Sequence, residues 1–324
     1  MAITNIYQPA KTTDVSEAFH VNRPPILQKI GNTPLLPITS LTRDISPRVK
    51  VYAKAEWFNP GGSVKDRPAL RMIEQAELRG DLRPGMTIID ATSGNTGIGY
   101  ALVGAAKGYP VTLVMAENVS LERKQIARAY GAQLIFSPAE EGADGAIRLV
   151  RDLVARSPES YYYPNQYDNP DNWLAHFYGT GPEIWRQTDG VITHFVTAVG
   201  TSGTFTGVGR YLKMRNPDIQ LLSVEPLDAD NAIEGVKHME SAIVPGIFDP
   251  GLKDGEVRVT SEQARAMTRR LIREEGLFVG FSAGAAIHSA LQVARTLDEG
   301  VIVTVMADSG AKYVSLWRQP HSTL

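Results

Sequence analysis

The chain contains no cysteine, which excludes disulfide bonds, thiolate metal sites and cysteine nucleophiles together. Any covalent chemistry must therefore use another side chain. Its apolar runs, such as Val301–Ala307, are far shorter than the roughly 20 residues that span a membrane, and its first residues lack the layout of a signal peptide. Lys and Arg number 33 against 35 Asp and Glu, which disfavours nucleic-acid binding. We expect a cytoplasmic protein with no membrane or nucleic-acid partner.

The length of 324 residues suits two α/β domains of ordinary size. Residues 1–25 are polar and aperiodic, so they predict an arm outside the core. Beyond them, β-rich runs alternate with segments of helical period, which predicts an α/β fold of two lobes with twisted, largely parallel sheets flanked by helices. The expected strands are 49–56, 87–91, 111–116, 133–137, 194–199, 220–225 and one from 301; the expected helices are 69–78, 98–106, 121–130, 143–155, 207–214, 261–275 and 284–296. Ligands bind at the carboxyl ends of parallel strands, so the loops there are the candidate site.

The loop NPGGSVKDRPA, Asn59–Ala69, precedes a predicted helix. Pro68 falls in the opening turn of that helix, where its missing N–H costs nothing, so Lys65 lies near the amino end. The helix dipole and partial burial both disfavour an ammonium there, which makes Lys65 a candidate for Schiff-base chemistry at neutral pH. The alternative is an ordinary solvated lysine beside Asp66.

Two further loops combine glycine with serine and threonine between a strand and a helix: TSGNTG at 92–97 and GTSGTFTGVGR at 200–210. Hydroxyls and backbone N–H groups at a helix start suit an anion such as a carboxylate or a phosphate. The alternatives are a dinucleotide-binding turn or a plain tight turn, but the spacing of Gly94, Gly97 and Gly99 is not G-x-G-x-x-G. Together the loops indicate a phosphorylated cofactor and a carboxylate substrate.

A fourth loop, GFSAGAA at 280–286, places Ser282 at the start of a helix. Taken alone, Ser282 is most simply a helix N-cap. A hydroxyl equally suits a neutral heteroaromatic nitrogen, whereas a carboxylate would keep that nitrogen protonated. The six histidines show no metal-binding spacing, so no metal is expected. Glu122, Arg123 and Lys124 are most simply a solvated helix face.

These loops and the motifs around them resemble the fold-type II pyridoxal-phosphate enzymes, which are tryptophan synthase β-like, and in particular the cysteine synthase and cystathionine β-synthase group. The similarity runs from Ile30 to about Tyr313. The motifs that carry it are IGNTPLL, NPGGSVKDR, ATSGNTGI, MAENVSLERKQIARAYGA, NQYDNPDN, THFVTAVGTSGTFTGVGR and EEGLFVGFSAGAA. So many motifs in one order make the resemblance highly specific.

The resemblance implies a role for each matching residue, with pyridoxal 5'-phosphate as cofactor. Lys65 matches the lysine that forms the internal aldimine and later moves the α-proton, Asn95 matches the asparagine that binds the cofactor's 3′-oxygen, and Ser282 matches the serine facing the pyridine nitrogen. The phosphate cup corresponds to Gly200, Thr201, Ser202, Gly203 and Thr204, and the substrate-carboxylate site to Thr92, Ser93, Asn95, Thr96 and Gln166.

The same resemblance implies a β-replacement reaction on an amino acid, with a sulfur nucleophile adding after the β-substituent has left. It implies a smaller mobile domain at residues 53–157, which carries the carboxylate loop, and a larger domain at 26–52 and 158–324, which carries the phosphate cup. It also implies a homodimer, and serine acetyltransferase is a candidate partner.

Residues 224–250 distinguish members of the group. Their sequence, VEPLDADNAIEGVKHMESAIVPGIFDP, is most similar to the B-type cysteine synthase, which is associated with bulkier donors such as thiosulfate, although Lys237, His238 and Met239 replace its Arg-Arg-Trp. Leu227 occupies the place of an arginine in the O-phosphoserine enzyme, and a phosphate needs a charged partner. We therefore expect O-acetylserine as substrate. The alternatives are O-phosphoserine sulfhydrylase, cystathionine β-synthase and a non-catalytic pyridoxal-phosphate-binding relative.

Overall fold

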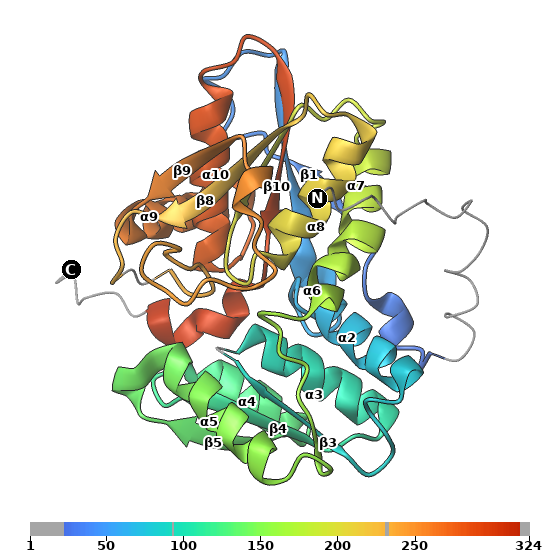
Figure 1. Cartoon of the computed structure of the whole chain (residues 1–324). Coiled ribbons are helices and arrows are strands. Elements are labelled where there is room, and N and C mark those ends of the chain that lie inside the picture. Colours follow the sequence, from blue (N-terminus) through green and yellow to red (C-terminus); the bar gives the residue numbers. More distant parts are fainter. Residues whose placement is uncertain (1–22, 93, 231–232, 318–324) are drawn as a thin grey trace, which may run out of the picture.

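The computed structural model describes residues 23–92, 94–230 and 233–317, which form an upper and a lower lobe in Figure 1. One lobe has a six-stranded sheet of order β1-β2-β10-β7-β8-β9, and the other a four-stranded sheet of order β5-β4-β3-β6. Neighbouring strands run parallel except β1 and β2. The strands are β1 (Leu35–Pro37), β2 (Val49–Ala55), β3 (Thr87–Ala91), β4 (Val111–Ala116), β5 (Gln133–Ser137), β6 (Tyr161–Tyr162), β7 (His194–Ala198), β8 (Gln220–Pro226), β9 (Gly255–Val259) and β10 (Gly300–Met306).

Helices connect these strands as the sequence pattern predicts. They are α2 (Asp66–Arg79), α3 (Asn95–Lys107), α4 (Leu121–Ala129), α5 (Gly142–Arg156), α6 (Pro170–Ala175), α7 (Gly181–Gln187), α8 (Gly203–Arg215), α9 (Ser261–Glu275) and α10 (Phe281–Ala294). Every expected strand and helix is confirmed, with ends that move by up to four residues. The pattern missed β1, β6, β9, α6 and α7. Most of these are too short for a periodic signal.

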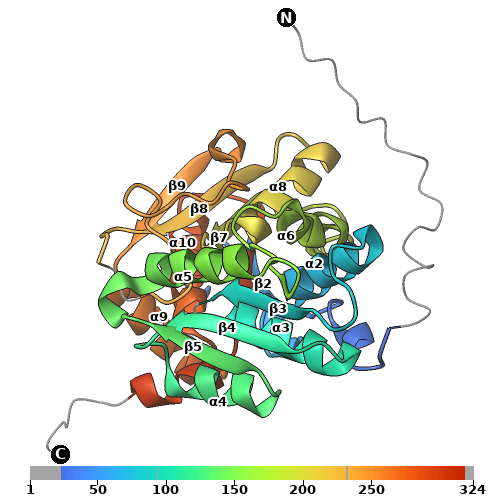
Figure 2. The ribbon, with the colours of Figure 1, turned by 60° about the horizontal axis from the view of Figure 1, so that its bottom comes forward.

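The four-stranded sheet is covered on both faces, which explains its nearly continuous apolar strands. Adjacent residues of β3 point to opposite faces. Ile88 packs in the cluster that contains residues of α2, α3 and α4, whereas Ile89 packs with residues of α5. Figure 2 shows α5 on one side of this sheet and α4 on the other. All six residues of β4 are buried for the same reason.

The six-stranded sheet is built in the same way around its central strand β10. Ile302 packs in a cluster with Leu271 of α9 and Leu291 of α10, and the next residue, Val303, packs with Leu212 of α8 on the opposite face. Parallel strands covered on both faces bring their carboxyl ends to one edge. The edges of the two sheets therefore define where a ligand can bind.

A buried network of four charges fixes the start of α2 next to Lys65. Arg67 donates from Nε to Oε2 of Glu56 and from Nη1 to Oε1 of Glu183, each at 2.7 Å. Lys54 Nζ lies 2.7 Å from Oε2 of Glu183. No side chain of the four is more than 7% exposed. Two cations thus balance two carboxylates in the interior.

Several expectations concern the ends and borders of the domains. Of the arm expected at residues 1–25, only Arg23–Pro25 are described, and Arg23 binds Glu74 through two bonds of 2.6 Å. The division at residues 53–157 stays a prediction, and its first border falls within β2. Among the helices of the described ranges, none is long and apolar enough to cross a membrane.

Candidate active site

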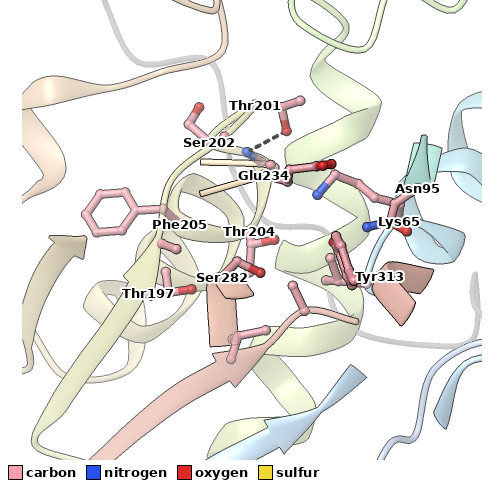
Figure 3. A pocket seen from close by; sticks show the side chains of 17 residues that line it. Lys65, Asn95, Thr197, Thr201, Ser202, Thr204, Phe205, Glu234, Ser282 and Tyr313 are labelled. Carbon is pink, nitrogen blue, oxygen red and sulfur yellow. Dashed lines mark hydrogen bonds between the residues drawn. The ribbon is translucent and has the colours of Figure 1, made fainter. Parts of the chain in front are cut away.

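A pocket opens where the carboxyl ends of β7 and β10 meet the start of α3 (Figure 3). It encloses about 570 Å³, including space open to solvent. The lining comes from both lobes: Val64, Lys65, Asn95, Thr197, Ala198, Gly200, Thr201, Ser202, Gly203, Thr204, Phe205, Glu234, Gly235, Ser282, Val305, Ala307 and Tyr313. The structure thus brings together eight residues that the sequence assigned to a cofactor site.

Lys65 immediately precedes α2, as its loop predicts. Burial lowers the pKa of its amine, while the carboxylates of Asp308 and Glu56 act in the opposite direction. Asp66 does not face solvent beside it, because the Asp66 carboxylate is buried and accepts a 2.5 Å bond from the backbone N–H of Gly61. This geometry disfavours an ordinary solvated lysine. A lowered pKa leaves more of the amine unprotonated at neutral pH, and only the unprotonated amine can act as a nucleophile or accept a proton.

The loop between β7 and α8 has the features of an anion cradle. Ser202 takes a left-handed conformation with φ of 67°, and its buried hydroxyl oxygen has no hydrogen-bond partner within the described residues. Glycine is required on both sides of it, because a Cβ on Gly203 would lie 2.0 Å from Oδ1 of Asn172 and one on Gly200 would lie 2.2 Å from the carbonyl oxygen of Gly235. An unsatisfied hydroxyl at the amino end of a helix fits the phosphate of the expected cofactor.

The loop after β3 is held by its own threonines. Thr92 Oγ1 accepts bonds from the N–H groups of Gly94 at 3.1 Å and Gly97 at 3.0 Å. Thr96 Oγ1 donates to Oε1 of Gln166 at 2.7 Å, which brings these two expected substrate residues together. Both are buried and neither lines the pocket, whereas Thr92 lines an adjoining cavity. Ser93 lies outside the described residues.

Asn95, the first residue of α3, reaches from the smaller sheet toward the other lobe. Its amide nitrogen donates to Oδ2 of Asp308 at 2.6 Å, and its amide oxygen accepts a bond from Nζ of Lys312 at 2.9 Å. Tyr313 donates its hydroxyl proton to the same oxygen of Asp308. Asp308 and Lys312 were not predicted from the sequence. Asp308 could have been predicted as a site residue, because it lies just after the carboxyl end of the last expected strand.

The interpretation of Ser282 as a helix N-cap is wrong. Helix α10 begins one residue earlier, at Phe281, with Gly280 at the N-cap and no side-chain capping bond. Ser282 is therefore inside the first turn, where its side chain lines the pocket. Its pairing with a neutral ring nitrogen stays a prediction.

The structure corrects one residue, Arg123, of the solvated helix face expected at Glu122, Arg123 and Lys124. Arg123 is 2% exposed and forms an ion pair with Glu234 across the two lobes. Space for it exists because Gly94 has no side chain: a Cβ there would lie 2.1 Å from Cδ of Arg123. Glu234 lines both the pocket and the adjoining cavity. It was not predicted from the sequence.

In the segment 224–250, the basic residues Lys237 and His238 have partners of their own and do not line the pocket. Lys237 Nζ lies 4.7 Å from the ring centroid of Tyr167, and it donates to the carbonyl oxygen of Ile243 at 3.2 Å. His238 pairs its Nδ1 with the hydroxyl of Ser241 at 2.8 Å. Leu227 is 47% exposed. None of these three residues presents an unused cation to the pocket.

Comparisons with known proteins identify the family of the chain. A family model described as "Pyridoxal-phosphate dependent enzyme" matches residues 26–308. The chain is 52% identical to a cysteine synthase of Aquifex aeolicus, over 92% of this chain and 93% of that one, and 45% identical to a cysteine synthase B of Pseudomonas aeruginosa, over 91% and 97%. It superposes with a TM-score of 0.85 on O-acetyl serine sulfhydrylase isoform 3 from Entamoeba histolytica, at 36% identity, covering 99% and 97% of the chains. The chain belongs to the pyridoxal-phosphate-dependent enzymes.

Proposed function

We propose that this protein is a cysteine synthase, which replaces the acetoxy group on the β-carbon of O-acetyl-L-serine with sulfide or thiosulfate and releases acetate. The observation that carries the proposal is one pocket in which Lys65, with its lowered pKa, shares the lining with an anion cradle at residues 200–204. Relatives named cysteine synthase support the choice of reaction. The fold and family establish the cofactor class, and the residues of the cradle fit its phosphate.

Each residue then has a defined task. Pyridoxal phosphate, when bound, supplies the electron sink that lets the α-proton and the β-acetate leave. Lys65 holds the cofactor, accepts the α-proton and returns it after sulfur has added at the β-carbon. The hydroxyl of Ser282 leaves the ring nitrogen unprotonated, which makes a weaker sink and suits elimination of a good leaving group such as acetate.

The substrate carboxylate binds at the loop after β3, through Thr92, Ser93, Asn95 and Thr96. Gln166 contributes by fixing this loop, because its Nε2 donates to the carbonyl oxygen of Ala91 at 2.8 Å while its Oε1 binds Thr96.

Two features of the chain support O-acetylserine over O-phosphoserine. Leu227 supplies no charge, and Lys237 is already engaged by Tyr167. Closure of a smaller domain at 53–157 over the substrate, a homodimeric state and binding to serine acetyltransferase belong to the same proposal and rest on the resemblance. A cytoplasmic location belongs to it too and rests on the sequence pattern.

The first experiment is an absorption spectrum of the purified protein, alone and after addition of O-acetylserine, O-phosphoserine or serine. We expect a band of the lysine-bound cofactor that changes with O-acetylserine and returns when sulfide or thiosulfate is added. A response only to serine followed by homocysteine assigns the protein as a cystathionine β-synthase instead.

The matched control is Lys65→Ala. This variant should lose the lysine-bound band and cysteine formation. Unchanged turnover would remove Lys65 from the reaction. An unaltered protein that lacks the band, or whose band responds to none of the substrates, would be a non-catalytic relative.

A further inference from the structure

Behind Asn95 lies a group of buried ionisable residues that the proposed reaction does not use. Lys312 and Asp308 follow β10 and are 4% and 0% exposed, and Asp66 at the start of α2 is also fully buried. Burying an ammonium or a carboxylate is unfavourable unless each group finds partners. Their partners therefore show what the arrangement holds in place.

One end of the Asn95 amide is bound by a hydrogen-bond acceptor and the other end by a hydrogen-bond donor. A carboxylate can only accept hydrogen bonds and an ammonium can only donate them. Asp308 accepts from the amide nitrogen at 2.6 Å, and Lys312 donates to the amide oxygen at 2.9 Å. A flipped amide would set an oxygen against the carboxylate and an NH₂ group against the ammonium. The pair therefore permits one orientation only.

Lys312 also joins the loop of Asn95 to the loop of Lys65. Its Nζ donates a second bond, of 2.8 Å, to the carbonyl oxygen of Gly61. Its Cε lies close enough that a Cβ on Gly62 would approach it to 3.4 Å. One buried cation thus binds two segments that each carry a residue of the pocket.

We propose that Lys312 and Asp308 are positioning residues that lock the Asn95 amide, so that its nitrogen, a donor, and not its oxygen serves as the partner of the cofactor's ring oxygen. This inference rests on the proposed function, because it takes Asn95 as the partner of that oxygen. A donated N–H favours the deprotonated ring oxygen, whereas a flipped amide would present an acceptor and favour the protonated one.

The electrostatic surroundings agree with this assignment. Burial lowers the pKa of Lys312, and the carboxylates of Asp308 and Asp66 oppose that change. Arg123 and Lys65 act in the same direction as burial. Lys312 Nζ donates to the carbonyl oxygen of Gly61 and to the amide oxygen of Asn95, and both of these atoms can only accept. Lys312 therefore acts as the donor in both bonds.

The test compares Lys312→Met with Lys312→Arg in the cofactor-loaded protein. Two quantities are measured: the absorption spectrum across pH, which reports the protonation of the ring oxygen, and the dissociation constant of pyridoxal phosphate. For K312M we expect more of the protonated form and about tenfold weaker binding, as for a lost bond to a charged group. For K312R, which keeps a cationic donor, we expect both quantities within about threefold of the parent.

The thermal midpoint of each apoprotein separates this role from folding. If K312M does not fold, Lys312→Gln decides, because its own amide can rotate and no longer fixes Asn95; a spectral shift in the same direction is expected. Parent-like spectra and cofactor affinity in folded K312M, or in K312Q, overturn the inference. They leave the proposed function intact, since that is tested on the unaltered protein, by its lysine-bound band and the response of that band to O-acetylserine.

Discussion

Replacing Glu183 by Gln tests the buried charge network most directly. The parent network holds Arg67 and Lys54 against Glu56 and Glu183, and the substitution leaves two cations facing one carboxylate. Removing one partner of a buried ion pair costs about 3–5 kcal/mol of stability. The pKa gives a matching figure: bonds from Arg67 outweigh burial and hold the pKa of Glu183 at about 2 instead of 4.5, which corresponds to roughly 3 kcal/mol at neutral pH.

The measurement is the free energy of unfolding of parent and variant in urea at pH 7, with thermal midpoints as a second readout. At roughly 2 °C per kcal/mol, E183Q should melt about 6–10 °C below the parent. Glu299→Gln is the matched control, because Glu299 is 76% exposed and lies 3.9 Å from an exposed Arg48. Surface pairs of this kind contribute about 0–1 kcal/mol to stability, so E299Q should have nearly the same thermal midpoint as the parent.

The pH dependence provides an independent check. A carboxylate whose folded pKa is lowered stabilises the fold above its unfolded pKa, and that contribution is lost as pH falls toward the folded pKa. The stability gap between parent and E183Q should therefore narrow from pH 4.5 toward pH 2. A gap below about 1 kcal/mol at pH 7, or one that stays constant in acid, would refute the assignment of Glu183 as a buried, charged partner.

Three further substitutions address the site. Ser282→Ala should leave the thermal midpoint unchanged, because no capping bond is lost, yet lower turnover at least about tenfold. A loss of unfolding free energy typical of a missing cap, about 1 kcal/mol, would contradict this. Thr96→Val removes the 2.7 Å bond to Gln166 and should raise KM for O-acetylserine about tenfold, measured by steady-state kinetics. Burial lowers the pKa of His176 to about 3, so the parent should lose stability as pH falls from 6.5 toward 3, and His176→Asn should lose less in urea titrations.

Local patterns predicted those parts of the site that one loop contains. The loops of Lys65 and of Ser202 each follow a strand or precede a helix, and their glycines mark where the backbone must come close to another group. By contrast, no local pattern predicted the buried ion pairs of Glu56, Arg67 and Glu183. Charged residues are normally exposed, and Arg67 and Glu183 are 116 positions apart in the chain.

Arg123 shows how a local pattern can mislead. Its neighbours in the helix are charged, so the sequence favours an exposed face. It is buried because Gly94, almost thirty positions earlier in the chain, leaves the space that its side chain occupies, and because Glu234 balances its charge from the other lobe.

The order of the strands explains why Asp308 and Lys312 belong to the site at all. β10 is the last strand in the chain but lies between β2 and β7, inside the six-stranded sheet. Its carboxyl end therefore emerges beside the loop of Lys65, where Ser63 and Asp308 form a bridge. Asn95 meets Asp308 across 213 positions and Lys312 across 217. No short stretch of the sequence contains both partners of these bonds. They come together only because β10, the last strand, pairs with β2, one of the first.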